Sequence, residues 1–182
     1  MIATNAKLTL PEFWALPPAE TNFELVQGAA VSKMAAKKFH AAVQKIVLRL
    51  LDDWNQGHAL PEWSVTLQRQ GEDWVPCPDV TYIAYARLPE DWSDTACPLP
   101  PDLAVEIISP GQTFGELAQK AEDYLIAGVY RVWVVDTPAK SLTVFYPDRP
   151  AHTYIGDQLL QDVHLPGLAF TPQQVFQRGR IG

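Results

Sequence analysis

The stretch DLAVEIIS, residues 102–109, decides the fold of this chain. It is a largely apolar run of strand length, which is typical of a strand buried on both faces of a sheet. The charged side chain in its middle is Glu106. A carboxylate at such a position must be paired, hydrogen-bonded or metal-bound, because burying it bare costs several kcal/mol. The run therefore predicts a central strand and marks one candidate site residue on it.

The segments after this strand predict a strand–helix–strand unit. Apolar residues at helical spacing indicate a helix of about residues 114–127, and Gly128 suits its end. YRVWVVD, residues 130–136, is a second buried strand. Two strands joined through a helix form a parallel pair with a right-handed crossover. We therefore expect an α/β fold with a mixed central sheet flanked by helices.

The clearest helix lies upstream, at about residues 36–54. Its apolar side chains recur at helical spacing and form one stripe that should pack on the sheet. Gly57 is a plausible stop for it. The stripe consists of Val43, Ile46, Val47, Leu50, Leu51 and Trp54.

The other expected elements are shorter, and several are bounded by proline or glycine. They are a helical turn in LTLPEFWALPPAE (8–20), a hairpin in FELVQGAAV (23–31), strands at 62–69 and 73–85, the second of which begins properly near Asp79, a long Pro-rich loop over 86–101, a hairpin strand at 140–147, and short strands and turns from residue 151.

Length and composition favour a single domain over residues 1–182 with a sizeable core, since 47% of the residues are hydrophobic. The net charge of −7 argues against a broad basic surface for DNA but leaves room for a local basic patch. No signal peptide is visible, and no apolar run approaches the ~20 residues that a membrane helix needs. We therefore expect a cytoplasmic protein without a membrane partner, with Cys77 and Cys97 reduced.

Three acids are interleaved with apolar strand residues: Glu24, Asp79 and Glu106. Asp79 opens one strand and Glu106 lies in the next, and sequential strands are usually neighbours, so both can converge at one end of the sheet. Two carboxylates and a backbone carbonyl, taken as that of Ile107, would make a half-open site for a hard divalent ion. The competing hypothesis is a set of structural ion pairs, to which Glu24 by itself is better suited than to a metal.

At these residues the sequence resembles the putative restriction endonuclease (Uma-two) family of the PD-(D/E)XK nuclease superfamily. The resemblance covers about residues 20–147. It rests on Phe23-Glu24-Leu25-Val26-Gln27-Gly28, Pro78-Asp79, Val105-Glu106-Ile107-Ile108-Ser109-Pro110, Lys120 with Tyr124, Gly128-Val129 and Trp133-Val134-Val135-Asp136.

The resemblance implies a restriction-endonuclease-like fold for the mixed central sheet, and Mg²⁺-dependent (or Mn²⁺-dependent) cleavage of DNA. Asp79 and Glu106 would bind the metal, and Glu24 would touch it directly or through water. The lysine of the superfamily motif should stand two residues after Glu106, where this chain has Ile108. Lys120 on the next helix would replace it, orienting the attacking water and neutralising charge. The alternative for Lys120 is a solvated helix lysine.

Further candidates could contact the substrate. His40, near the start of the long helix, could donate to a phosphate, although a helix-border histidine without such a role is the commoner case. Gln112 could line the entrance to the site. Lys38 belongs to a basic cluster that could steer a phosphate backbone or form a solvated helix face. The cluster consists of Lys33, Lys37, Lys38, Lys45 and Arg49.

Two functions remain open from the sequence. The first is a metal-dependent DNA endonuclease, which exposed aromatics and the family resemblance predict to be a homodimer with one site for each strand. Its sequence specificity would come from loops such as 86–101. The second is a non-catalytic dimeric binding or regulatory protein on the same scaffold, which the acidic net charge and the displaced lysine favour. An enzyme for another phosphate ester has no specific support, since there is no Gly-rich phosphate loop.

Overall fold

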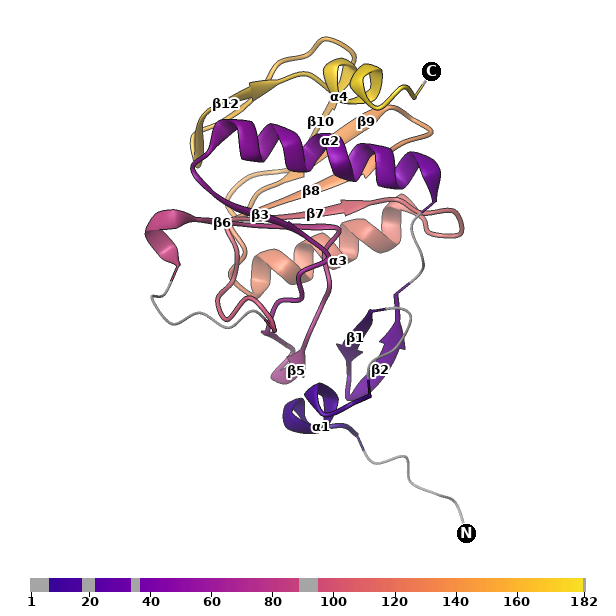
Figure 1. Cartoon of the computed structure of the whole chain (residues 1–182), viewed down its shortest axis with the longest axis vertical. Coiled ribbons are helices and arrows are strands. Elements are labelled where there is room, and N and C mark those ends of the chain that lie inside the picture. The colour runs from indigo at the N-terminus through magenta and orange to yellow at the C-terminus, as the bar shows by residue number, and fades with distance from the viewer. Residues whose placement is uncertain (1–6, 18–21, 34–36, 89–94, 182) are drawn as a thin grey trace.

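A mixed six-stranded sheet forms the centre of the computed structural model, which describes residues 7–17, 22–33, 37–88 and 95–181 (Figure 1). The strand order is β10-β9-β8-β7-β6-β3. β7 and β8 are parallel, and the other neighbours are antiparallel. These strands are β3 (Gly57–Pro61), β6 (Val80–Ala84), β7 (Leu103–Ile107), β8 (Arg131–Asp136), β9 (Ser141–Phe145) and β10 (His152–Ile155).

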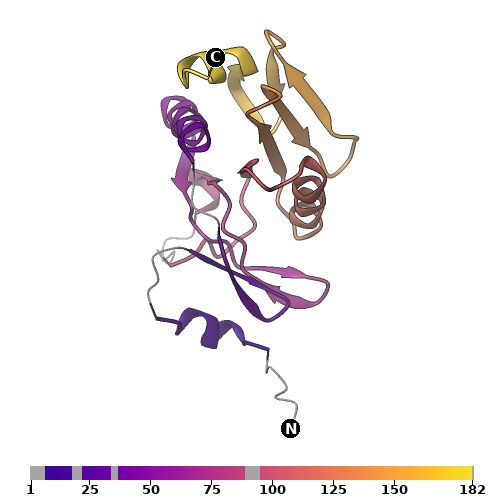
Figure 2. The ribbon, with the colours of Figure 1, turned by 90° about the vertical axis from the view of Figure 1, so that its right-hand side faces the viewer.

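Two helices cover the two faces of this sheet, as the side view shows (Figure 2). They are α2 (Lys38–Trp54) and α3 (Phe114–Ile126). Alternate residues of β7 pack toward different helices: Leu103 and Val105 join the cluster that includes the inner face of α2, whereas Ala104 joins the cluster beneath α3. By the same alternation Glu106 lies on the α3 face. The expected mixed sheet flanked by helices is confirmed, as is the parallel pair joined through α3.

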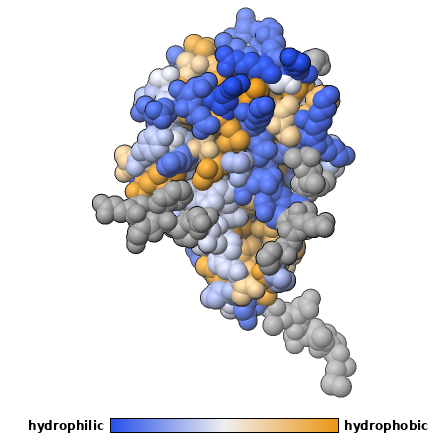
Figure 3. Space-filling view, in the orientation of Figure 1, coloured by the Kyte–Doolittle hydropathy of each residue, from blue (hydrophilic) through white to orange (hydrophobic). Residues whose placement is uncertain are grey.

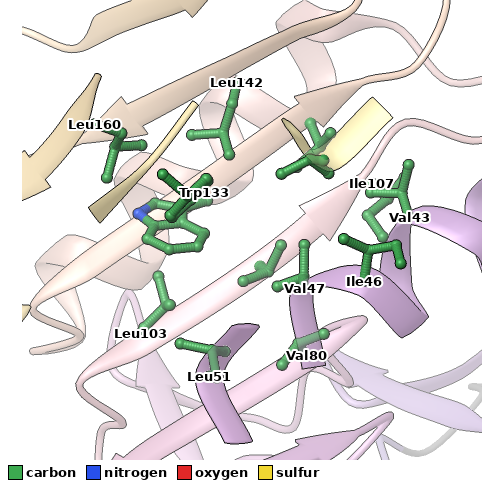
Figure 4. Close-up of a cluster of buried hydrophobic side chains, with 14 of the residues drawn as sticks. Val43, Ile46, Val47, Leu51, Val80, Leu103, Ile107, Trp133, Leu142 and Leu160 are labelled. Atoms are coloured by element: carbon green, nitrogen blue, oxygen red, sulfur yellow. The ribbon is translucent and has the colours of Figure 1, made fainter. Parts of the chain in front are cut away.

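The larger core lies between the sheet and α2 (Figure 4). Trp133 of β8 is fully buried at its centre, and the ring of Phe170 packs 5.3 Å from it. The predicted stripe of α2 supplies the opposite wall, with four residues buried and Leu50 and Trp54 partly buried. The outward face of α2 carries the exposed Lys38, Lys45 and Arg49, and hydrophilic side chains prevail over this part of the surface in Figure 3.

A smaller N-terminal layer packs below one edge of the sheet (Figure 1). It contains α1 (Leu10–Trp14), the hairpin of β1 (Phe23–Val26) and β2 (Ala29–Ser32), and the hairpin of β4 (Leu67–Arg69) and β5 (Glu72–Trp74). Leu25 and Val75 exchange two backbone hydrogen bonds of 3.0 Å and so tie the two hairpins together. The first hairpin turns through Gln27 and Gly28, both with positive φ, as a two-residue hairpin requires.

Two expectations about local structure were wrong. The segment 62–69 is not one strand: β3 lies before it and pairs with β6, while β4 takes its last residues. Gly57 does not stop the helix, because Asn55 ends α2 in the left-handed conformation. Gly57 instead lies in β3, where a Cβ would come 2.2 Å from the carbonyl oxygen of Ile83.

The C-terminal tail holds more structure than the sequence suggested. β11 (Leu160–Asp162) and β12 (Leu165–Phe170) form the expected short strands, but the helix α4 (Pro172–Arg178) follows them and packs against α2. A capping box between Thr171 and Gln174 starts this helix.

The Pro-rich segment 86–101 is also partly ordered. It begins with a 3₁₀ turn, η1 (Tyr85–Arg87), and Cys97 forms a parallel bridge with Val65. Residues 89–94 lie outside the described residues.

Candidate metal and phosphodiester site

The site lies at the sheet edge where β7 ends and β6 begins. β6 and β7 pair antiparallel with Val80 opposite Val105, so continuing the register by one residue sets Asp79 opposite Glu106. A hydrogen bond of 2.9 Å from the Asp79 N–H to the Val105 carbonyl oxygen holds this register. The two acids that the sequence singled out therefore stand side by side, on adjacent strands.

A cavity of about 190 Å³ opens at this edge. Its walls come from the first hairpin, the start of α2, both central strands and α3. The lining residues are Glu24, Val31, Ser32, Lys33, His40, Asp79, Glu106, Ile107, Ser109, Gln112 and Lys120. All but one of the sequence-predicted site residues are in this set; the exception is Lys38, whose ammonium lies 5.7 Å from the centroid of the Phe39 ring. A DNA contact through Lys38 stays a prediction.

Asp79 is held on both carboxylate oxygens, and its side chain is 3% exposed. Oδ2 accepts the Ile107 N–H at 2.6 Å and lies 2.9 Å from Nε2 of His40. Oδ1 lies 2.7 Å from Nζ of Lys33. Burial alone would raise the pKa of Asp79, but the hydrogen bond from His40 and the charge of Lys33 lower it below its usual value. Asp79 is therefore an anion, as a ligand of a cation must be.

Glu106 is buried on the α3 face and contacts two side chains of that helix. Its Oε1 accepts the Tyr124 hydroxyl at 2.8 Å and lies 3.0 Å from Nζ of Lys120. Burial raises the pKa of Glu106, and the nearby carboxylates of Asp79 and Glu24 act in the same direction against the charge of Lys120. Burial and the Glu106 carboxylate also raise the pKa of Tyr124, so its phenol keeps the proton that it donates.

Lys120 links the N-terminal hairpin to the central strands. Its Nζ donates to Oε1 of Glu24 at 2.8 Å in addition to its contact with Glu106. The same oxygen of Glu24 accepts the Cys77 N–H at 3.0 Å. Burial alone would lower the pKa of Lys120, but the two carboxylates raise it above its usual value, so this lysine is a fixed cation. α3 thus brings Lys120 to the acidic residues, as the replacement of the missing motif lysine requires.

Two glutamine side chains bind backbone groups of the site. Gln112 accepts the Ser109 N–H at 3.0 Å through its side-chain oxygen, which fixes the turn after β7. Gln44, one helical turn after His40, donates to the Asp79 carbonyl oxygen at 2.8 Å. The α2 helix therefore braces Asp79 from two positions.

The sequence did not single out Lys33 or Gln44. Lys33 was seen only as a member of a basic cluster, and its contact with Asp79 depends on how the hairpin packs over β6. From the sequence, Tyr124 was named with Lys120 in the family resemblance, without a polar role. A buried tyrosine hydroxyl generally needs a partner, and this was a usable signal.

The loop 86–101 leaves from the other end of the sheet, since it joins the end of β6 to the start of β7. None of its described residues, 86–88 and 95–101, lines the cavity. Its role in DNA specificity is therefore not supported by its position.

The fold and this edge of the sheet define a class, that of the restriction-endonuclease-like α/β proteins. The crystal structure of a putative nuclease belonging to DUF820 from Anabaena variabilis ATCC 29413 is similar to this chain, with a TM-score of 0.83 over 94% of this chain and 99% of that one. The two sequences are 21% identical, so the likeness shows the fold.

The family follows from the sequence itself. The family model Uma2, described as putative restriction endonuclease, matches residues 10–175, and the chain belongs to this family. The resemblance drawn from the motifs is confirmed, and it extends further in both directions than expected. No protein of curated function matches the sequence. In the described part of the chain, no helix has the length and apolar character to cross a membrane.

Proposed function

We propose that this protein is a metal-dependent endonuclease that hydrolyses phosphodiester bonds of DNA. The observation that supports this most strongly is the meeting of Asp79, Glu106 and the Lys120 ammonium in one cavity. Two acids at the ends of adjacent strands, with the lysine of α3 beside them, supply what phosphodiester hydrolysis needs. These are a place for a cation, a positioned water and a positive charge for the developing anion. The family to which the chain belongs, described as putative restriction endonuclease, favours the same chemistry.

The donor set fits a hard divalent ion such as Mg²⁺ or Mn²⁺. Asp79 and Glu106 offer carboxylate oxygens and Ile107 a backbone carbonyl, the kinds of ligand that such ions take while keeping several waters. The ammonium of Lys33 already stands beside Oδ1 of Asp79, where a cation would bind. Within the described residues, no group of three or more His, Cys, Asp and Glu side chains is placed to hold a metal. The proposed site would therefore need water molecules and the Ile107 carbonyl beside its two carboxylates.

When bound, the metal would activate a water molecule and stabilise negative charge on the phosphoryl oxygens. The side chains of the protein have separate tasks. Lys120 orients the attacking water and neutralises charge, and Glu24 holds Lys120 in place. Tyr124 orients Glu106, and His40 orients Asp79. Gln112, which lines the cavity, is the candidate contact for a phosphate. A phosphate contact through His40 stays a prediction, because His40 is buried and its Nε2 lies 2.9 Å from Asp79.

The test is cleavage of supercoiled plasmid by purified protein with Mg²⁺ or Mn²⁺. Asp79→Asn and Glu106→Gln preserve shape and remove charge. Each should lower cleavage by at least about 100-fold, because it weakens binding of the metal that would stabilise the transition-state charge. Glu122→Gln is the matched control, because Glu122 is exposed on α3 two residues from Lys120. Cleavage that survives Asp79→Asn or Glu106→Gln would reject the assigned site.

The second candidate is a non-catalytic dimeric binding or regulatory protein. The specific observation in its favour is that lysines already pair with all three site carboxylates, as plain structural ion pairs would. Metal affinity separates the two functions. A wild type that neither cuts DNA nor binds Mn²⁺ in calorimetry would favour this candidate over the nuclease.

The homodimer and the cytoplasmic location also stay predictions. Sedimentation of the purified protein tests the homodimer, because it measures the mass of the assembly. A dimer would bring one site to each DNA strand.

A further inference from the structure

Lys33 is a second lysine of the site, contributed by the N-terminal hairpin. It follows β2 directly, and its side chain is 15% exposed. Its Nζ donates to the Cys77 carbonyl oxygen at 2.9 Å and lies 2.7 Å from Oδ1 of Asp79. Together with Lys120 from α3, Lys33 gives the cavity two ammonium groups, each from a different element.

The backbone of Lys33 is anchored, so this contact does not depend on a free chain end. Its N–H donates to the Asn22 carbonyl oxygen at 2.8 Å, which continues the hairpin by one residue beyond the Phe23–Ser32 pair. Burial alone would lower the pKa of Lys33, but the carboxylates of Asp79 and Glu106 raise it, so the side chain is a cation.

The two oxygens of Asp79 differ in what a metal ion would meet. Oδ2 is occupied by the Ile107 N–H and the His40 ring. Oδ1 has the Lys33 ammonium as its partner among the described residues. A divalent cation that takes Oδ1 comes within a few ångströms of this ammonium, and two cations at such a distance repel each other strongly in a buried site.

We propose that Lys33 is a tethered cation that holds the metal position at Asp79 in the metal-free protein and is displaced when the metal binds. After displacement its ammonium keeps the Cys77 carbonyl as an acceptor and remains at the cavity wall, where a DNA phosphate oxygen can take the place of Asp79. Lys33 is thus a positioning residue first and a substrate contact second. The inference rests on the proposed function, because it requires Asp79 to bind the metal.

Removal of the Lys33 charge should therefore change metal binding in the direction opposite to a ligand mutation. Lys33→Met keeps the length and apolar stem of the side chain but not its charge. It should tighten Mn²⁺ binding by about 10-fold or more, within the range by which groups around a metal ligand alter affinity. Lys33→Arg retains the charge and should bind Mn²⁺ much as the wild type does.

The experiment is calorimetric titration of Mn²⁺ into the full-length wild type and both variants at one pH and salt concentration, with no DNA present. Arg87→Met is the matched control, because it removes an ion pair of 2.9 Å with Asp102 at the other end of the sheet. Thermal denaturation gives an independent measure: Lys33→Met should melt lower than wild type without metal and gain more from added Mn²⁺.

The outcomes are separable. Tighter Mn²⁺ binding in Lys33→Met, with Lys33→Arg and Arg87→Met unchanged, supports the inference. Equal or weaker binding in Lys33→Met, when the wild type binds, overturns it and leaves the proposed metal site intact. If Mn²⁺ binds neither the wild type nor Lys33→Met, the proposed function and this inference fall together.

Discussion

Tyr124→Phe tests whether Glu106 is held as a buried anion. The substitution removes one hydroxyl, the group that donates to Glu106 at 2.8 Å, and leaves the ring that packs 4.9 Å from Trp74. A hydrogen bond to a charged group contributes about 1.5–3 kcal/mol. Because Tyr124 is fully buried and Glu106 is 4% exposed, water does not replace the lost donor without opening the site. We expect about 2 kcal/mol of lost stability at neutral pH.

Tyr82→Phe provides the matched control. Tyr82 is 1% exposed, and among the described residues its hydroxyl has no hydrogen-bond partner. Removing a buried hydroxyl that lacks a partner should be neutral or slightly stabilising. The difference between the two variants therefore isolates the Glu106 contact from the general effect of the tyrosine-to-phenylalanine change.

The assay is urea denaturation of wild type and both variants between pH 5 and pH 8. Burial raises the pKa of Glu106 in the folded state, so the carboxyl costs stability as rising pH ionises it. The Tyr124 hydroxyl offsets part of this cost, since it stabilises the ionised form. The destabilisation by Tyr124→Phe should accordingly grow with pH. An equal effect of the two substitutions, or a Tyr124→Phe effect that shrinks as pH rises, would refute the reasoning.

Three further predictions concern the scaffold. Asp162→Asn should cost about 3–5 kcal/mol at pH 7, because it leaves the buried Arg131 without its carboxylate. Burial alone would raise the pKa of Asp162, but Arg131 lowers it. The stability from the Asp162–Arg131 pair is therefore present above the unfolded-state pKa and is lost as pH falls through the folded-state pKa. Denaturation from pH 7 to pH 3 should show the difference in stability between wild type and Asp162→Asn becoming smaller. Gly57→Ala should lower stability by about 1–3 kcal/mol, since its Cβ meets the Ile83 carbonyl. Gly115→Ala, with no atom nearer than 4.0 Å to the new Cβ, should raise stability by about 0.5–1 kcal/mol. Thermal denaturation of wild type and both glycine variants measures the two changes.

The strands of the sheet were predictable where composition and length allow a segment only one secondary structure. DLAVEIIS and YRVWVVD are too apolar for a surface and too short for a buried helix, so their strand character follows from composition. In the segment 57–69 the expected strand was 62–69, whereas β3 occupies residues 57–61 and pairs with β6. Which stretch pairs with β6 depends on the reach of the chain from the end of α2, and no local pattern expresses that. By contrast, α4 carried a capping box with Pro172 at its start, a signal that was present and was not used.

The candidate site shows the same division. Glu106 and Asp79 could be found because an acid within an apolar strand demands a partner wherever the strand lies. Lys33 could not be found in this way, because a lysine after a hairpin has the same local pattern whether it faces water or a carboxylate. Its significance arises only when the hairpin packs over the start of β6. Acids in apolar surroundings therefore identify candidate site residues from sequence. Lys120 was named only through the family resemblance, and Lys33 required the tertiary structure.

On the proposed function, the net charge of the cavity determines the order in which metal and DNA bind. Three carboxylates, those of Glu24, Asp79 and Glu106, face the ammonium groups of Lys33 and Lys120. With all five charged the cavity carries one net negative charge, in a chain whose net charge is −7. Such a cavity repels a phosphate until a divalent cation reverses its sign. On the proposed function, the metal must therefore enter before the DNA, and the displacement of Lys33 is the step that would link the two events.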